Sequence, residues 1–443
     1  MEKCFREFKI ESLEGWNVDT YYDLYTKVFH RYGFLLGLWQ AEMHPYGTMI
    51  HIQHEKGKLV GSETMAPCPP HLHKAMRKKL MFTVELNEEN IVESFCHMGP
   101  NRLSHKCNIF PEDNNKNRVC FRCCVEAAHR NPGGMRREFE QFMMDESWEI
   151  EEAIFTGKIE LLQKFRVLKK FEACFDLNRI ILPVDEPDAV IKPGLYKADY
   201  AMFGYELILV FYTDNKNKII GKKVTGDPRV PAGQIAFEGK MDEPIFLLGE
   251  HQESLANVEE RGHDPIPEGI HYKLLPEQDF FLPHDCSYEG KIPSSCSFRF
   301  HAMMNISPAN VNTAFFLPSH LIVFNRKSFA LLAFQAETLF TFLPIVVLLN
   351  TKTSLFFKDY NFNYWLQRLR ISPHKADVAR LEIILKYGGI YFDYDEIALR
   401  SFDPLLNHSV VLGQETVGCS LDNGPIQTFT VASTFGVYRT NIF

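Results

Sequence analysis

The sequence lacks a strong excess of either charge. It has 48 basic and 56 acidic residues and a formal net charge of −8, so it carries no basic footprint for nucleic acid. The N-terminal residues 1–7 also lack the apolar core of a signal peptide. No internal repeat or low-complexity tract is present. These absences exclude a nucleic-acid partner and give no sign of secretion.

Long apolar runs are also scarce. Residues 328–349 come closest to the length of a bilayer span, but they contain Gln335, Glu337 and Pro344. An acid at the centre of a membrane helix costs about 2.5–3.5 kcal/mol on insertion scales. We therefore predict buried strands here, and no membrane association.

The composition that is present is that of a folded protein. Hydrophobic residues make up 45% and charged residues 23% of the chain, which excludes a disordered protein. The 443 residues would suggest about three domains. Aromatic residues reach 13%, with 37 Phe, and favour strand-rich packing over a helical bundle.

The order of apolar residues along the chain predicts a mainly β protein with helical insertions. Helical spacing marks residues 21–40 and 135–173, whereas period-two alternation marks about ten short strands between residues 49 and 344. The polar stretch 249–278 is expected to be an insertion or linker. So many short strands with one helical insert predict a closed or nearly closed β-barrel.

The pattern changes after about residue 349. Residues 374–387 have the periodicity of a helix, Gly388-Gly389 would end it, and residues 390–395 resume as a strand that ends in acids. This order is an α/β signature that does not belong to the preceding barrel. We predict that a fragment of an unrelated architecture follows the barrel.

Cysteine is unevenly distributed. Five of the 11 cysteines lie within residues 96–124, which in a long intracellular chain indicates a metal site more than disulfides. Zinc takes four N or S ligands, usually as two short-range pairs. Cys96 with His105 and Cys123 with His129 form two such pairs, in a region expected to be a loop-rich insertion that the metal would stabilise. Two alternatives stay open. Other residues could serve as ligands, namely His97, Cys107, Cys120 and Cys124, or the cluster could consist of reduced thiols and surface histidines without a metal.

Several longer motifs carry a family resemblance. The chain from about residue 20 to 345 resembles the substrate-binding domain of the F-box only protein 31 family, the substrate receptors of SCF (Skp1–Cullin–F-box) ubiquitin ligases. The motifs that carry it are LYTKVFHRYGFLLGLWQ (24–40), APCPPHLH (66–73), GGMRREF (133–139), IKPGLYKADY (191–200), VTGDPRVPAGQ (224–234), FFLP (280–283) and LIVF (321–324).

The resemblance implies a non-catalytic β-barrel in the cytoplasm or nucleus that captures C-terminal tails of proteins such as D-type cyclins for ubiquitination and proteasomal degradation. It also implies a structural Zn²⁺ site of Cys-x7-His and Cys-x5-His arms. Cys123 and His129 match the second arm, while Cys96 and His105 need a small local shift to match the first.

Three residues are candidates for binding the substrate tail. Asp227 precedes Pro228, which is typical of a type I turn, and the same loop is a candidate for the rim of the tail pocket. Trp39 and Tyr46 are aromatic residues near a turn, although core packing is the commoner role of such residues.

The family's F-box, the helical segment that contacts the Skp1–Cul1 core, has no counterpart in these residues. Residues 1–19 are expected to be a remnant that follows a missing F-box.

A second resemblance covers about residues 346–443. Lys375-Ala376-Asp377, Arg380, the double glycine, Asp393 and Asp395 are similar to the sugar-binding region of glycosyltransferases with a DXD motif. Carboxylates at i and i+2 of a strand end can share a divalent cation and a diphosphate. By this resemblance Asp393 and Asp395 would meet a nucleotide sugar and its Mn²⁺, and Asp377 and Arg380 the donor sugar. A metal-dependent glycosyltransferase is therefore the alternative to the receptor, and a fused gene in which neither function is complete is a third reading.

Overall fold

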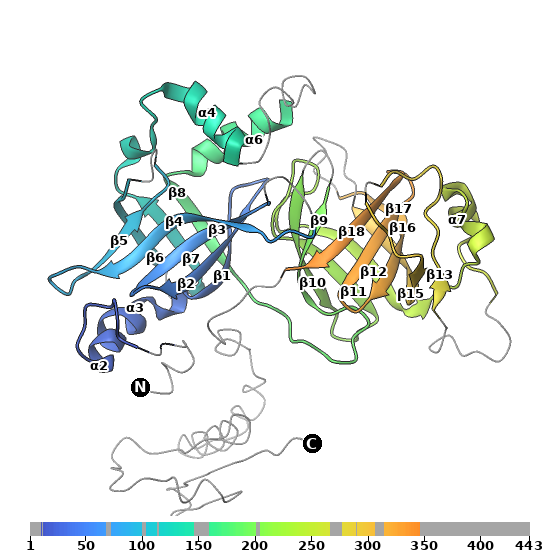
Figure 1. Ribbon diagram of the computed structural model, residues 1–443, viewed down its shortest axis with the longest axis horizontal. Coiled ribbons are helices and arrows are strands. Elements are labelled where there is room, and N and C mark those ends of the chain that lie inside the picture. Colours follow the sequence, from blue (N-terminus) through green and yellow to red (C-terminus); the bar gives the residue numbers. More distant parts are fainter. Residues whose placement is uncertain are drawn as a thin grey trace, which may run out of the picture. The chain divides into compact units, whose positions relative to one another are not determined.

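The described residues of the computed structural model form two closed β-barrels of eight strands each (Figure 1). The predicted mainly β fold is confirmed, although residues 20–345 form two barrels where the sequence suggested one. The structure describes residues 10, 12–67, 72–99, 103–112, 115–145, 159–200, 204–265, 277–288, 290–305 and 314–345.

The first barrel is an antiparallel meander closed by its first and last strands, since β1 pairs with β8. The two hairpins predicted from alternation are confirmed as β2–β3 and β4–β5. The strands are β1 (Gly37–Ala41), β2 (Thr48–Glu55), β3 (Lys58–Met65), β4 (Arg77–Leu86), β5 (Val92–Cys96), β6 (His105–Glu112), β7 (Asn115–Cys123) and β8 (Cys174–Ile180).

The second barrel closes where β18 pairs with β9. Residues 328–333 and 338–344 are its last two strands, so the prediction of buried strands in this apolar stretch is confirmed. No helix in the described ranges is long and apolar enough to cross a bilayer. The strands are β9 (Gly194–Asp199), β10 (Tyr205–Tyr212), β11 (Lys218–Lys223), β12 (Ile235–Pro244), β15 (Phe298–Asn305), β16 (Phe316–Asn325), β17 (Ser328–Ala333) and β18 (Thr338–Pro344).

Each barrel encloses its own hydrophobic core. Trp39 is fully buried in the first core, where its Nε1 donates to the Leu35 carbonyl and the Arg179 guanidinium lies 4.2 Å from its ring centroid. Phe329 and Phe342 stack with centroids 4.7 Å apart in the second core. These inward positions explain the alternation from which the strands were predicted.

The two barrels also contact each other directly. A small apolar cluster joins residues of both barrels, among them Leu38 from the first and Leu207 from the second. Gln40 Nε2 donates to the Val224 carbonyl at 2.6 Å, and Ala232 N donates to the Pro45 carbonyl at 2.8 Å. Gly47 has a φ of +64°, and a Cβ there would lie 2.6 Å from Ala232 Cβ. The contact therefore requires glycine at this position.

The helices are shorter than the sequence predicts. In place of a helix over residues 21–40, α2 (Tyr21–Leu24), a π-helical turn (Tyr25–Phe29), α3 (His30–Tyr32) and a 3₁₀ turn (Gly33–Leu35) are followed by β1. The second predicted helical region contains α4 (Gly134–Asp145) and α6 (Ile159–Phe171), which pack together through Phe139, Phe142 and Phe165 (Figure 1).

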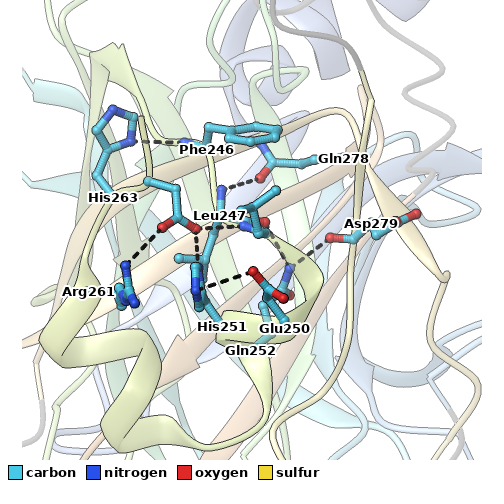
Figure 2. Close-up of polar contacts among 11 residues, drawn as sticks. Phe246, Leu247, Glu250, His251, Gln252, Arg261, His263, Gln278 and Asp279 are labelled. Carbon is cyan, nitrogen blue, oxygen red and sulfur yellow. Dashed lines mark hydrogen bonds and ion pairs between the residues drawn. The ribbon is translucent and has the colours of Figure 1, made fainter. Parts of the chain in front are cut away.

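The described part of the stretch expected to be an insertion or linker, residues 249–265 and 277–278, packs on the second barrel. It includes a 3₁₀ turn (Gly249–Gln252) and α7 (Leu255–Arg261), and β13 (Gln278–Asp279) follows to pair with β14 (Ser295–Cys296). Gln252 Nε2 donates to the Leu247 and Asp279 carbonyls at 3.1 and 2.9 Å (Figure 2). Gln252 Oε1 also accepts from the buried Arg299 of β15 at 2.8 Å. The segment is therefore an integral cover, not a free linker.

Residues 346–443 lie outside the described residues. The predictions for Asp377, Arg380, Asp393 and Asp395 fall in this region.

Candidate functional site

Four predicted metal ligands converge at one end of the first barrel. Cys96 ends β5 and His105 begins β6, and these two residues are direct partners in the antiparallel ladder. Cys123 ends β7, and His129 lies in the following 3₁₀ turn (Glu126–His129). The ligands therefore join ends of three neighbouring strands, which differs from the predicted loop-rich insertion.

The geometry of these side chains suits one tetrahedral metal ion. One potential ligand atom from each residue lies within 4.8 Å of all the others. His105 Nε2 and His129 Nε2 are 3.0 Å apart, and Cys96 Sγ and His129 Nε2 are 3.7 Å apart. With Zn–N near 2.0 Å and Zn–S near 2.3 Å, tetrahedral ligand atoms would be separated by about 3.3–3.8 Å. A Cys2His2 cluster that could hold a metal is therefore present.

Surrounding backbone groups orient the ligand atoms. His105 Nδ1 lies 3.1 Å from the Leu103 carbonyl, which favours a proton on Nδ1 and leaves Nε2 for a metal. Cys96 Sγ accepts from Met98 N at 3.5 Å, and Cys123 Sγ accepts from Val125 N at 3.3 Å. Both cysteines thus receive an N–H from two residues ahead, which would stabilise a thiolate.

Protonation in the absence of metal follows from burial. Burial raises the pKa of the Cys96 thiol to about 12 and lowers the pKa of His129 to about 4, where the positive charges of His105 and Lys169 add to the effect. His129 is therefore neutral at pH 7, as a ligand must be, whereas Cys96 must lose its proton to the metal.

The competing candidates point to other partners. His97 Nε2 lies 3.1 Å from Thr83 Oγ1, and the exposed Cys124 accepts from Asn108 Nδ2 at 3.4 Å. Cys107 is buried in the first core, and Cys120 lies next to Asp176. Cys107 is the direct ladder partner of Cys123, so strand register alone does not exclude it. The alternatives that the sequence left open are narrowed because the ligand atoms of Cys96, His105, Cys123 and His129 lie within 4.8 Å of one another.

A separate small pocket of about 110 Å³ lies where the two barrels meet. Tyr46, Thr48 and Thr64 line it from the first barrel, and Tyr205, Glu206 and residues 225–228 line it from the second. Lys164 of α6 forms another part of the wall. The pocket thus includes two of the three predicted tail-binding residues, Tyr46 and Asp227.

Trp39 does not line this pocket, because it is buried in the core of the first barrel. Its predicted role in substrate binding stays a prediction, and the structure gives it the packing role that aromatic residues more commonly have.

Asp227 forms the predicted turn and also faces charged neighbours. Its Oδ1 accepts from the backbone N–H groups of Arg229 and Val230 at 2.6 and 3.0 Å, and its own N–H donates to the Val230 carbonyl at 3.2 Å. Its Oδ2 accepts from Lys223 Nζ at 2.5 Å. Burial opposes the charge of Asp227, but Lys223 and the hydrogen bonds outweigh it and hold the pKa of Asp227 below its usual value.

Lys223 is shared by a second carboxyl group. Its Nζ lies 2.5 Å from Glu206 Oε2, and the side chains of Lys223 and Glu206 are 1% and 3% exposed. The Glu206 carboxyl also lies beside that of Asp227, so the three groups form one buried cluster next to the pocket.

Sequence analysis did not single out Glu206 and Lys223. Both occupy strand positions, on β10 and β11, where a charged residue would normally face solvent. One signal was available, because Lys223 lies on the same face of β11 as the buried Ile219 and Gly221. The VTGDP loop follows at once and makes this alternation hard to recognise in the sequence.

Folding stability should depend on pH through Glu206. Burial raises the pKa of Glu206 to about 8, although the positive charge of Lys223 opposes this rise. The folded state therefore keeps a proton that the unfolded state releases near pH 4.5. Between these values stability should fall as pH rises, by at most about 1.4 kcal/mol per pH unit. Glu206→Gln should flatten this dependence. Melting temperatures of both proteins from pH 5 to 9 test it, and identical pH profiles would refute it.

Comparisons with known proteins identify relatives of both parts of the sequence. The family model described as "Cyclin D1 binding domain" matches residues 178–345, which contain the whole second barrel. The model described as "Glycosyltransferase sugar-binding region containing DXD motif" matches residues 319–412. The two matches share residues 319–345, which include most of β16 and all of β17 and β18.

Curated relatives match about half of the chain. F-box only protein 31 of Homo sapiens is 33% identical over 221 residues, which are 49% of this chain and 40% of the human protein. The Rattus norvegicus protein is 32% identical over 230 residues, with 51% and 44% covered. F-box only protein 31-B of Xenopus laevis is 30% identical over 253 residues, with 55% and 47% covered. The matched region spans less than half of each relative. The resemblance to F-box only protein 31 and to the DXD glycosyltransferase region is therefore confirmed, each over a part of the chain.

Proposed function

We propose that this chain is the substrate-recognition subunit of an SCF ubiquitin ligase and that it binds the C-terminal tails of target proteins such as D-type cyclins. Similarity to F-box only protein 31 and the match to a cyclin D1 binding domain support this proposal. The receptor would act in the cytoplasm or nucleus, with the Skp1–Cul1 core as its partner and degradation of the captured protein as the outcome.

The observation that carries the proposal is the pocket with Glu206 and Asp227 at its wall. A volume of about 110 Å³ is too small for a folded element and suits the end of an extended chain. Ligand pockets commonly combine apolar lining with a few fixed polar groups that orient the ligand. Here Lys223, behind the wall, and the turn hold the carboxylate of Asp227 in place, and the Glu206 carboxyl lies beside it.

We assign a structural Zn²⁺ to the Cys96, His105, Cys123 and His129 cluster. Zinc is the metal that most commonly occupies closed Cys2His2 sites in proteins. When bound, it would supply only folding free energy, since all four of its positions are filled by protein ligands.

A peptide-binding measurement tests the receptor function. A fluorescent peptide with a D-type cyclin C-terminus should bind the purified full chain, and Thr64→Trp should abolish binding because the indole fills the pocket that Thr64 lines. Lys222→Trp is the matched control, since Lys222 is exposed on β11 and lies outside the pocket lining. Equal binding by both variants, or none by the unmodified chain, would contradict the proposal.

The second candidate is a metal-dependent glycosyltransferase that uses a nucleotide sugar and Mn²⁺. The family match to residues 319–412, which includes Asp393 and Asp395, is the observation that favours it. Since the match begins inside the second barrel, we infer that only part of such an enzyme is represented and that the receptor is the function of residues 20–345. Mn²⁺-dependent hydrolysis of a nucleotide sugar that is lost in Asp395→Asn would reverse this preference.

A further inference from the structure

A second, larger cavity lies beside the small pocket. It measures about 400 Å³, which is in the size range of ligand-binding pockets. Its walls are β3 and β4 of the first barrel on one side and α4 and α6 on the other. Glu63, Met65, Asp145 and Leu168 line both cavities, so the two lie next to each other.

The lining of this cavity combines charged and polar groups, among them the candidate metal ligand His129, with an adaptable apolar part. The apolar part contains four methionines, together with Phe142 of α4 and Phe165 of α6. Methionine side chains are flexible and polarisable, and they recur at surfaces that accept several different apolar ligands. The four are Met43, Met65, Met81 and Met98.

The charged groups of the wall are already engaged with each other. Lys79 Nζ lies 2.6 Å from Asp145 Oδ2, and Lys169 Nζ lies 2.9 Å from Glu138 Oε2 and 2.5 Å from Glu172 Oε2. Glu63 accepts from Thr48 Oγ1 at 2.8 Å. A charged ligand group would have to compete with these pairs, whereas an apolar group would leave them intact.

We propose that this cavity is a second subsite for the substrate tail, which receives one large uncharged apolar side chain a few residues before the tail's end. The proposal rests on the proposed function, because the small pocket is taken to hold the end itself. The shared wall residues Met65 and Leu168 place the two cavities within reach of one extended chain, and the paired wall charges select an apolar occupant. The subsite therefore determines which tails are bound, with tolerance among Leu, Met, Ile and Phe.

Binding of designed tails tests the second subsite. Peptides would share one cyclin-type final residue after a Gly/Ser segment, and a single Leu would be placed in turn at each of the five positions before it. One position should strengthen binding by about 10- to 100-fold, the effect of burying one large apolar side chain. Asp at the same position should give no gain.

Two variants locate the effect in the cavity. Phe142→Ala removes part of its wall and Met98→Glu places a charge in it, so both should abolish the gain from Leu while leaving binding of the Gly/Ser peptide unchanged. Met144→Glu is the control, since Met144 is exposed on α4 and lies outside the lining. Because Met98 follows Cys96, metal content of that variant is measured in parallel.

The outcomes separate the two proposals. If all peptides bind equally, or the variants keep the gain from Leu, the second subsite is wrong while the receptor function stands. If no peptide binds at any position of Leu, the receptor function itself fails, and the second subsite with it.

Discussion

The double variant Cys96→Ser/Cys123→Ser should lose its metal and a large part of its stability. Metal binding to a Cys2His2 site contributes directly to folding free energy, about 10–16 kcal/mol in isolated zinc-finger peptides at pH 7. Within a barrel that has its own core, we expect a loss of at least about 3 kcal/mol. Elemental analysis should find one zinc per unmodified chain and none in the variant, and the variant should melt at a clearly lower temperature.

The strand register allows a matched control for this experiment. Cys124 is adjacent to a ligand in sequence but is exposed and hydrogen-bonded to Asn108. Cys124→Ser should therefore keep the zinc and the melting temperature of the unmodified chain. Absence of zinc from the unmodified chain, or equal melting temperatures for the ligand variant and the control, would refute the metal site.

Replacement of Lys223 by methionine should have the second large effect. The ammonium group is 2.5 Å from carboxyl oxygens of both Glu206 and Asp227, and all three side chains are buried. Removal of one member of a buried ionic group costs about 3–5 kcal/mol, because the remaining charges are left uncompensated. Denaturant unfolding at pH 7.5 should show a loss of this size, together with loss of tail binding.

The same variant should be less destabilised in acid. Glu206 already holds a proton below its pKa of about 8, and Asp227 can take one up in acid once the lysine is absent, so the difference from the unmodified chain should shrink at pH 5. Lys222→Met, on the exposed face of the same strand, should change stability by at most about 0.5 kcal/mol. A Lys223→Met protein as stable as this control would show that the buried cluster contributes nothing.

The sequence predicted local structure better than it predicted closure of the sheets. Hairpins such as β2–β3 were visible because alternation and a short Lys56-Gly57 turn act over a few residues. Two barrels were not visible, because closure depends on β1 pairing with β8 and β9 with β18. Each of these pairs joins segments more than a hundred residues apart, and no local pattern specifies them.

The candidate site residues, like the fold, were predicted where the signal is local and missed where it depends on long-range packing. Ligand types and spacing pointed to Cys96, His105, Cys123 and His129, but only their convergence in space separates them from the competing Cys107 and Cys124. Glu206 and Lys223 were missed because a charged residue on an alternating strand is normally solvent-exposed. They share the inward phase of Ile208 and Ile219, which belong to the core of the second barrel, and their mutual pairing inside it is not visible in the sequence.

The most direct test of the receptor account compares a peptide that ends at the natural C-terminus of the target with one that extends beyond it. Affinities of the purified chain would be measured for a D-type cyclin C-terminal peptide and for the same peptide extended by five glycine and serine residues. The small pocket between the barrels predicts that extension reduces binding at least about 100-fold, since the end group can no longer enter. Equal affinities for the two peptides would contradict recognition of chain ends.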